Sequence, residues 1–272
     1  MTRLSRLRDD PLEAIVFDLD WSGTRLLERV GAAASVPRWR SALYRGDGVM
    51  CPVCSRGFRR FAPDHLGRPV LCPACASQER HRALWLFLDG RERPLAGVGR
   101  LLHLAPEPGI LARLRERGDF EYVTADLDSP HADDRVDVQA LPYEDTSFDA
   151  LICSHVLEHG PDDRRAMGVL LRVLRPGGTA LVMVPVDRSL ASTKEDPSVT
   201  DEAGRRAAFW QEDHLRLYGR DFAGRLEAAG FAVEVRPLAA EHGAAAARRF
   251  GLSELDDLFV ARRPGQPGDP QG

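Results

Sequence analysis

The stretch LLHLAPEPGIL, residues 101–111, decides the fold. A leucine-rich run ends at the loop 106–109, and apolar residues at helical spacing begin at Ile110. A strand, a tight loop and a helix in this order place backbone N–H groups and a helix N-terminus against a ligand. The loop carries one glycine where a nucleotide-binding loop commonly has two or three. The stretch is therefore either a modified cofactor loop or an ordinary α/β turn.

Beyond residue 83 the chain alternates between short apolar runs and segments of helical periodicity. The predicted strands are 100–104, 121–126, 149–153, 178–184, 231–236 and 257–262. The predicted helices are 109–117, 162–174, 203–211, 219–229 and 241–250. Such alternation is typical of a parallel sheet with helices on both faces, which is an α/β fold. The Pro- and Gly-rich tail, 264–272, is expected to be disordered.

The chain of 272 residues, 43% of them hydrophobic, is long enough for one sizeable core and a small accessory module. No apolar run approaches the roughly 20 residues of a membrane span, and the start has no secretory pattern. We therefore expect a soluble, cytoplasmic protein without a membrane partner. The net charge of −4 gives no overall attraction to nucleic acid.

Residues 1–50 have mixed character, and we interpret them as a helical or irregular segment that packs on the main domain. The stretch IVFDLDWSGT, residues 15–24, is similar to the aspartate-rich strand end of haloacid-dehalogenase-type phosphatases. A Thr or Val should stand four residues after the first aspartate of that motif, but Ser22 stands there. We therefore reject a phosphatase.

Residues 51–82 form a cysteine module. Two CxxC pairs, Cys51 with Cys54 and Cys72 with Cys75, are separated by seventeen residues. Each pair places two thiolates on one knuckle, and two knuckles complete a tetrahedral S₄ shell that suits zinc. A redox-active CxxC is the alternative, but two matched pairs favour zinc. Because four sulfur ligands leave no position for water, the zinc is expected to be structural.

The cysteine module is locally basic. Six arginines against Asp64 and Glu79 give a formal charge of +4 over residues 51–82. This charge is suited to RNA or an anionic substrate, or it is an ordinary solvated surface balanced by the acidic main domain. At the end of the module, Arg80 and His81 either point into a site or cap the interface with the main domain.

Several blocks in register resemble the class I S-adenosylmethionine (SAM)-dependent methyltransferases. They are the block from Asp137 to Asp149, SHVLEH at 154–159 and LRPGG at 174–178. The cysteine pairs before the domain, with EDHLRLYGRDFAGRLEAAGF at 212–231, resemble a bacterial subgroup with an N-terminal zinc ribbon. The resemblance implies a Rossmann-like seven-stranded sheet, residues 83–263, preceded by a Cys₄ ribbon.

The resemblance also implies a set of cofactor-binding residues. In the first loop, the family's acidic-x-G-x-G-x-G pattern places His103, Ala105, Glu107 and Gly109 at the acidic and glycine positions, and only Gly109 is retained. His103 and Glu107 are expected at the amino-acid end of SAM, with Glu107 near its ammonium. Asp126 would hold the ribose hydroxyls, with Leu127 beside it. Asp137 and Val138 would bracket adenine, and Ser154 would lie near the transferable methyl group.

An oxygen or amine nucleophile must lose a proton during methyl transfer, so a nearby base accelerates the reaction. His155 and His159 follow the fourth strand of the domain, close to the expected methyl group. His214 lies in EDHLRLYG, where Asp213, Arg216 and Tyr218 accompany it. We favour His214 because the Asp-His pair offers a base and Arg-x-Tyr offers an anion anchor. Cys153 is interpreted as a core residue.

The leading hypothesis is methyl transfer to a small polar or anionic metabolite, at oxygen rather than nitrogen. The second hypothesis is an RNA methyltransferase that uses the ribbon to contact nucleic acid. The negative net charge and the lack of basic stretches with interleaved aromatic residues count against it. Two further hypotheses are a peptide carboxyl methyltransferase and a non-catalytic binding protein that keeps the fold.

Overall fold

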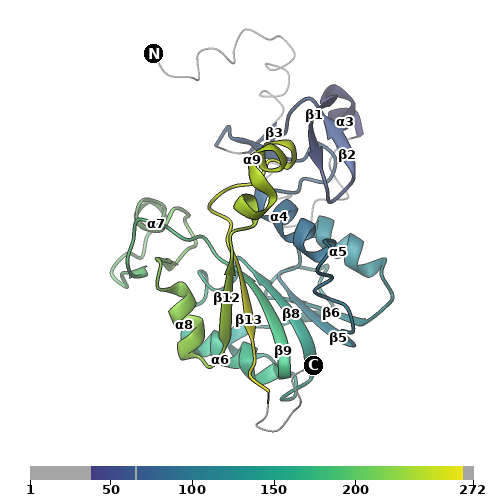
Figure 1. Ribbon diagram of the computed structural model, residues 1–272. Helices are drawn as coiled ribbons and strands as arrows, with labels where there is room; N and C mark the ends of the chain where they lie inside the picture. The colour runs from purple at the N-terminus through teal and green to yellow at the C-terminus, as the bar shows by residue number, and fades with distance from the viewer. Residues whose placement is uncertain (1–37, 65, 266–272) are drawn as a thin grey trace.

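The computed structural model describes residues 38–64 and 66–265, and its centre is a seven-stranded sheet (Figure 1). In spatial order the strands are β12 (Ala232–Arg236), β13 (Leu258–Arg262), β9 (Leu174–Met183), β8 (Phe148–Ser154), β5 (Arg100–Leu104), β6 (Glu121–Asp126) and β7 (Asp134–Arg135). Strand β13 is antiparallel to both of its neighbours, and the pairs from β9 to β7 are parallel. The expected seven-stranded α/β sheet is confirmed.

The two central strands are buried along nearly their whole length. In β5 the run from Leu101 to Leu104 is buried, and in β8 every residue except Asp149 is buried. A strand covered on both faces needs a continuous apolar run, which both sequences supply apart from the buried polar residues His103 in β5 and Ser154 at the end of β8. Parallel pairing sets Leu104 opposite Cys153, so the carboxyl ends of the two strands lie side by side.

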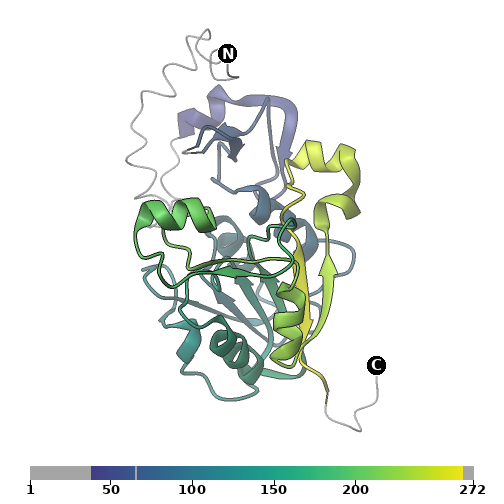
Figure 2. The ribbon, with the colours of Figure 1, turned by 90° about the vertical axis from the view of Figure 1, so that its left-hand side faces the viewer.

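Helices cover both faces of the sheet. Residues of α4 (Glu79–Leu88), α5 (Pro108–Arg115) and α9 (Leu238–Phe250) share one apolar core with one face of the sheet. Residues of α6 (Asp163–Val173) and α8 (Phe222–Ala228) share a second core with the other face. The layers are seen in the turned view of Figure 2.

The cysteine module lies beyond the carboxyl ends of the parallel strands, at the top of Figures 1 and 2. Helix α3 (Arg38–Leu43) and most of the first strand precede residue 51, and the module continues through two hairpins. Strand β1 (Arg45–Cys51) pairs with β2 (Arg56–Phe58), and β3 (Ala62–Pro63) pairs with β4 (Pro69–Leu71). Each cysteine pair therefore lies at or just after a strand end, where a turn can hold two thiolates.

A fully buried arginine joins this module to the carboxyl end of helix α9. The Arg82 guanidinium donates hydrogen bonds to the carbonyls of Val70, Ser77, Phe250 and Gly251, at distances from 2.6 to 2.8 Å. Buried charge is tolerated when its donors are satisfied in this way. The core that contains α4 and α9 runs across the expected boundary at residues 82 and 83. The domain boundary therefore remains a prediction from the sequence, and the residues on its two sides pack into one apolar core.

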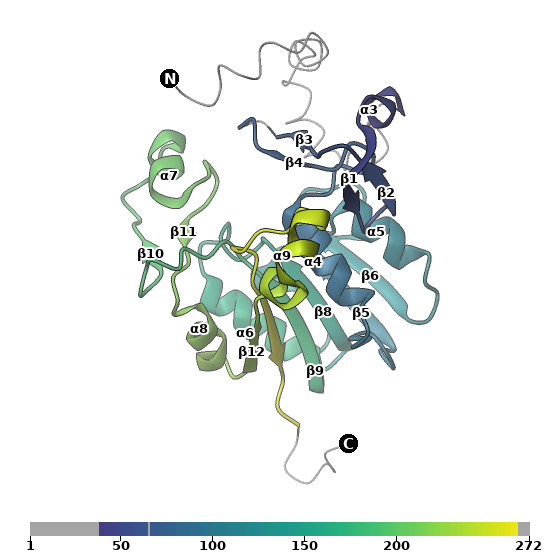
Figure 3. The same cartoon turned by 45° about the horizontal axis from the view of Figure 1, so that its top comes forward.

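A third group of short elements lies on the opposite side of the carboxyl edge from the module (Figure 3). It consists of β10 (Lys194–Glu195), α7 (Glu202–Phe209) and β11 (Arg216–Leu217), inserted between β9 and α8. Strands β10 and β11 pair antiparallel. The sequence segment 187–220 thus forms an arm over the sheet edge where the fourth strand of the domain ends.

The predicted elements agree with the structure except at some of their ends. Strand β9 begins at Leu174, four residues before the predicted start. Helix α9 begins at Leu238, and Gly243 interrupts it with a φ of 78°. The short strand β7 is absent from the predicted strands, because a two-residue strand carries no periodicity.

Residues 1–37, with the aspartate-rich stretch, and the tail beyond 265 lie outside the described residues. Within those residues, no helix is long and apolar enough to cross a membrane.

Candidate active site

The residues expected to bind the cofactor gather at the carboxyl edge of β5, β6 and β8. Two residues at this edge, one from the expected cofactor loop and one from the expected catalytic residues, take strained backbone conformations. Ala105, directly after β5, has a φ of 48°, and His155, directly after β8, has a φ of 54°. Their N–H groups donate to Ala125 and Met183 carbonyls on neighbouring strands, each at 2.8 Å. Strain of this kind in non-glycine residues gathers at functional sites.

The proline-bearing loop forms a regular helix start. Glu107 stands at the N-cap of α5 with extended backbone (φ −68°, ψ 130°), and Pro108 occupies the first helical turn. Proline fits there because its missing N–H needs no helical partner and its φ suits the helix. Ala105 supplies the left-handed turn that a glycine supplies in the family pattern. The loop therefore makes a left-handed turn and enters α5 without the glycines that the family pattern carries at Ala105 and Glu107.

His103 and Glu107 form a buried pair within this loop. His103 Nε2 lies 3.0 Å from Glu107 Oε2, and His103 Nδ1 lies 2.7 Å from the Tyr122 hydroxyl. Burial opposes ionisation of Glu107, but the His103 hydrogen bond and charge outweigh it and hold its pKa well below the usual range. Glu107 Oε1 is buried and accepts no hydrogen bond of normal geometry from the described residues, although the Ser154 hydroxyl is close enough to help lower the pKa of this carboxyl. An ionised oxygen in that state is suited to a cationic ligand group.

The expected ribose and adenine residues lie along the same edge. Asp126, at the end of β6, accepts hydrogen bonds at Oδ1 from the N–H groups of Asp128 and Ser129, both at 2.7 Å. Leu127 is exposed. Asp137 caps the short helix η3 (Val138–Ala140) by accepting from Gln139 N–H at 2.8 Å.

Ser154 and His155 lie at the end of β8. The Ser154 Oγ is buried and makes no hydrogen bond of normal geometry with the described residues. His155 Nδ1 lies 3.1 Å from Glu158 Oε1. Burial, with the charge of Arg80, lowers the pKa of His155, so its imidazole is neutral near pH 7. Cys153 is fully buried in the core, as expected.

Three side chains meet just beyond His155. Donor atoms of Glu158, His159 and His214 all lie within 4.8 Å of one another. Burial opposes ionisation of Glu158, but the neighbouring His155, His159 and His214 lower its pKa to about 2. Glu158 is a functional candidate that sequence reasoning missed. Its position inside SHVLEH, between two histidines, was the available signal.

The prediction that Arg216 and Tyr218 anchor an anionic ligand is wrong. Arg216 is buried and donates to the carbonyls of Leu157, Gly160 and Pro161, and it also faces Glu195 and Asp163. The Tyr218 hydroxyl donates to Asp163 at 3.0 Å in the core. Both side chains are committed to internal partners, so they hold the arm onto the sheet edge. A single sequence does not separate a buried arginine from one that faces a ligand.

His81, at the end of the cysteine module, caps helix α4. Its Nδ1 accepts from the Gln78 N–H at 3.2 Å. Burial, with the charge of Arg80, lowers the pKa of His81 to about 3, while Glu107 acts in the opposite direction. His81 Nε2 is buried without a hydrogen bond from the described residues. The His81 imidazole therefore caps the helix and also lies close enough to Glu107 for the two charges to interact.

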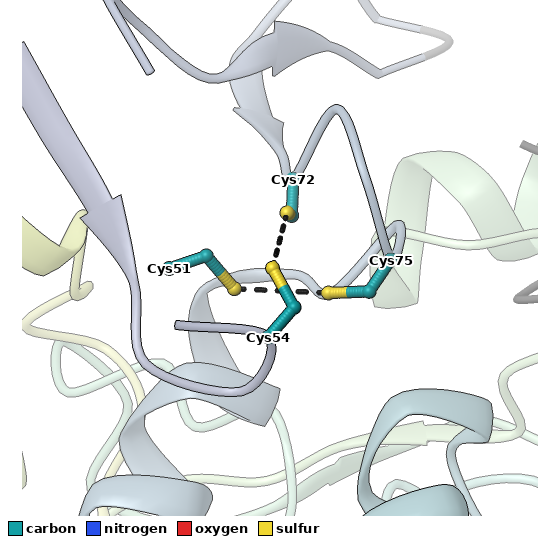
Figure 4. Close-up of side chains that lie close together, drawn as sticks. All are labelled: Cys51, Cys54, Cys72 and Cys75. Atoms are coloured by element: carbon teal, nitrogen blue, oxygen red, sulfur yellow. Dashed lines mark hydrogen bonds between the residues drawn. The ribbon is translucent and has the colours of Figure 1, made fainter. Parts of the chain in front are cut away.

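The four cysteine sulfurs form a compact cluster (Figure 4). Cys51 Sγ lies 3.7 Å from Cys75 Sγ, and Cys54 Sγ lies 3.6 Å from Cys72 Sγ. A disulfide requires a separation of roughly 2.05 Å. Four sulfurs at about 2.3 Å from a tetrahedral zinc lie about 3.8 Å apart. The spacing is that of a metal shell rather than of disulfides, and Ala74 N–H adds a hydrogen bond to Cys72 Sγ at 3.4 Å.

The cysteine module touches the cofactor loop directly. A Cβ placed on Gly109 would lie 3.0 Å from Val53 Cγ1 and 4.0 Å from Cys75 Sγ. Gly109 does not have a left-handed φ, so its glycine character is explained by this close approach. The resemblance implies that Gly109 lacks a side chain because the backbone approaches the cofactor there. The structure adds the close approach of Val53 as a second reason.

The basic charge of the module is partly internal. Arg82 is buried, and Arg68 pairs with Asp64 at 2.7 Å. The guanidinium groups of Arg59 and Arg60 lie 5.7 and 5.8 Å from the centre of the Tyr44 ring. These contacts favour a structural role for much of the charge over a nucleic-acid surface.

A methyltransferase-domain family model matches residues 75–235, which is more than half of the chain. An uncharacterised methyltransferase of Mycobacterium sp. (strain KMS) is 34% identical over 97 residues, covering 32% of this chain and 38% of that protein. A probable S-adenosylmethionine-dependent methyltransferase of Mycolicibacterium smegmatis is 33% identical over 127 residues, covering 45% and 42%. The chain thus spans about two fifths of the length of these curated relatives.

Two further proteins are similar to this chain. A demethylmenaquinone methyltransferase of Clavibacter sepedonicus is 33% identical over 114 residues, covering 36% of this chain and 46% of that protein. A solved S-adenosylmethionine-dependent methyltransferase from Mesorhizobium loti is 19% identical with a TM-score of 0.45, covering 66% of this chain and 98% of that one. On the family match, the chain belongs to the SAM-dependent methyltransferase family.

Proposed function

We propose that the protein transfers a methyl group from SAM to an oxygen of a small, polar or anionic metabolite. The observation that carries this proposal is the Glu158, His159 and His214 group at the end of β8. An alcohol or phenol must lose its proton as the new bond forms, and an imidazole is suited to accept it near neutral pH. The Clavibacter relative is named for a quinone acceptor rather than for a nucleic acid.

The residues of the first loop fit SAM. The buried, ionised Glu107 Oε1 accepts no hydrogen bond of normal geometry from the described residues and would hold the ammonium of the amino-acid end, with His103 keeping the carboxylate in place. Ala105 and Gly109 would line the same loop. Asp126 and Leu127 would hold the ribose, Asp137 and Val138 the adenine, and Ser154 would lie nearest the sulfonium. When bound, SAM supplies the electrophilic methyl group.

Three histidines are proposed to handle the acceptor's proton. His214 is the first choice, because its Nδ1 donates to the Phe209 carbonyl at 2.9 Å and burial lowers its pKa, which leaves a neutral ring with the lone pair on Nε2. His159 is partly exposed and adjacent to it, with the ring centroids 4.9 Å apart. His155 is the third, beside Ser154. Alignment of the acceptor with the methyl group supplies further acceleration.

The four cysteines are proposed to hold one structural Zn²⁺ that stabilises the module 51–82, beside the methyltransferase domain 83–263. Their sulfur spacing fits a closed tetrahedral shell, which leaves no coordination position for chemistry. Because Val53 and Cys75 border Gly109, the zinc would also hold the start of α5 in place. Cytoplasmic location is retained as part of this proposal, since free thiolates persist in a reducing compartment.

Methyl transfer from labelled SAM to hydroxylated small molecules and, separately, to RNA tests the acceptor class. We expect label in small hydroxylated acceptors and none in RNA. In His214→Gln, kcat should fall about 100-fold while affinity for S-adenosylhomocysteine is unchanged. The matched control is His242→Gln, an exposed histidine of α9. Label in RNA alone, or full activity in His214→Gln, would contradict the proposal.

A further inference from the structure

The group formed by Glu158, His159 and His214 has the composition of a metal site. Two imidazoles and one carboxylate present their donor atoms within 4.8 Å of one another. Two histidines with one carboxylate form a common three-ligand set for divalent transition metals, and they leave other positions open. This group is separate in the fold from the four cysteines of the module.

The two segments that supply these ligands are fixed to each other. Leu215 N–H donates to the Glu158 carbonyl at 2.9 Å, which ties the residue after His214 to the residue before His159. Arg216 clamps the turn 157–161 through its bonds to the carbonyls of Leu157, Gly160 and Pro161. The geometry of the three donors is therefore set by the backbone rather than by flexible side chains.

Each imidazole has an outer partner. His214 Nδ1 donates to the Phe209 carbonyl at 2.9 Å, so Nε2 carries the lone pair. His159 Nδ1 lies 3.4 Å from Asp213 Oδ2, which leaves its Nε2 as the other donor. A carbonyl or carboxylate behind a ligating histidine fixes its tautomer and orientation, and it is a regular feature of metal sites.

Glu158 supplies the observation that points to a bound cation. Its side chain is fully buried, and neither oxygen accepts a hydrogen bond of normal geometry from the described residues, although His155 Nδ1 lies 3.1 Å from Oε1. A buried carboxylate in this state requires a compensating charge. A divalent cation held between Glu158 and the two imidazoles would supply it.

We propose that Glu158, His159 and His214 bind one divalent first-row transition-metal ion, with open positions that face the acceptor. The binding stands on the geometry alone, whereas the use of the ion rests on the proposed function. With the ion bound, the Nε2 lone pairs of His159 and His214 are taken by the metal, so the two imidazoles act as ligands and no longer as bases. A hydroxyl oxygen at an open position then gives its proton to water more readily, because the cation lowers its pKa. That oxygen then forms the O–C bond, and the electron pair of the broken S–C bond passes to the sulfonium sulfur.

Cobalt titration of the zinc-loaded, untagged protein tests the site. With the cysteines already occupied, we expect one equivalent of Co²⁺ to bind, measured by calorimetry, without the intense thiolate-to-cobalt absorption bands that exchange into the Cys₄ shell would produce. Glu158→Gln and His214→Gln should each weaken Co²⁺ binding at least tenfold, whereas His242→Gln should not. Asp213→Asn, which changes only an outer partner, should weaken it less.

Each result decides the proposal. Absence of Co²⁺ binding, or equal binding by the wild type and both ligand variants, would overturn it. S-adenosylhomocysteine titration of the same samples shows whether each variant is folded. If a ligand variant is not folded, Asp213→Asn is used in its place in the Co²⁺ titration. Co²⁺ binding without methyl transfer to any hydroxylated acceptor would leave the metal site standing and overturn the proposed function. Methyl transfer that continues after a chelator has removed this ion would leave the proposed function standing and overturn the catalytic use of the ion.

Discussion

Gly109, in the first turn of the helix after the cofactor loop, lies against Val53 of the cysteine module, so closely that an added Cβ would stand 3.0 Å from Val53 Cγ1. The contact joins the sulfur cluster to the loop that is proposed to hold SAM. Because Val53 stands between Cys51 and Cys54, neither side of the contact can move without shifting a cysteine or the start of α5.

Gly109→Ala should weaken binding of S-adenosylhomocysteine several-fold while leaving zinc content at one per chain. The added methyl group must push the knuckle and the loop apart, and overpacking of this kind costs about 1–3 kcal/mol. Calorimetry and metal analysis measure the two quantities. Gly168→Ala is the matched control, since a Cβ there meets no atom within 4 Å and the position lies within α6. Unchanged affinity in Gly109→Ala would show that the contact does not position the loop.

Ala105→Val should lower the free energy of unfolding by about 2 kcal/mol. Ala105 has a φ of 48°, where a β-branched side chain is strongly disfavoured. Ala105→Gly should leave stability nearly unchanged, because relief of strain offsets the larger entropy of the unfolded chain. Urea unfolding measures both. Ala112→Val on the exposed side of α5 is the control, with an expected loss below about 1 kcal/mol from helix propensity. A loss in Ala105→Val no larger than in this control would mean that the turn relaxes freely.

Asp126→Asn should reduce affinity for S-adenosylhomocysteine about 10- to 100-fold, and Asp126→Ala should abolish binding. The amide oxygen of asparagine can still accept the N–H groups of Asp128 and Ser129, so the turn survives while the charge-assisted bonds to ribose are lost. Zinc content should remain intact in both variants. Calorimetric binding that survives in Asp126→Ala would show that the ribose lies elsewhere.

Stability should fall as the pH is lowered from about 6.5 towards 3, in part because of His81. Burial lowers its pKa in the folded protein to about 3, from an ordinary value of 6.5. Between these values the unfolded chain binds the proton and the folded chain does not, so acid favours unfolding. Urea midpoints at several pH values measure the slope. His81→Gln can still accept the Gln78 N–H and should flatten the slope, whereas His242→Gln should not. Parallel pH profiles for the wild type and His81→Gln would contradict this assignment.

The sheet and the cysteine cluster could be predicted because local patterns encode them. Leucine-rich β5 and the apolar run of β8 identify buried parallel strands, and CxxC spacing identifies a knuckle. The roles of Arg216 and Glu158 could not be predicted in the same way. The partners that define these roles lie 55 to 59 residues away, such as Leu157 for Arg216 and His214 for Glu158. No periodicity records such long-range contacts.

The buried Arg82 has a consequence for how the chain matures on the ribosome. Two of its four carbonyl partners belong to the cysteine module, and the other two, Phe250 and Gly251, lie 168 and 169 residues further along the chain. During synthesis the module emerges before α9, and parts that emerge first generally fold first. Here the guanidinium remains incompletely satisfied until residues 250 and 251 have also been translated. Helix α9 therefore completes a part of the molecule that was synthesised well before it.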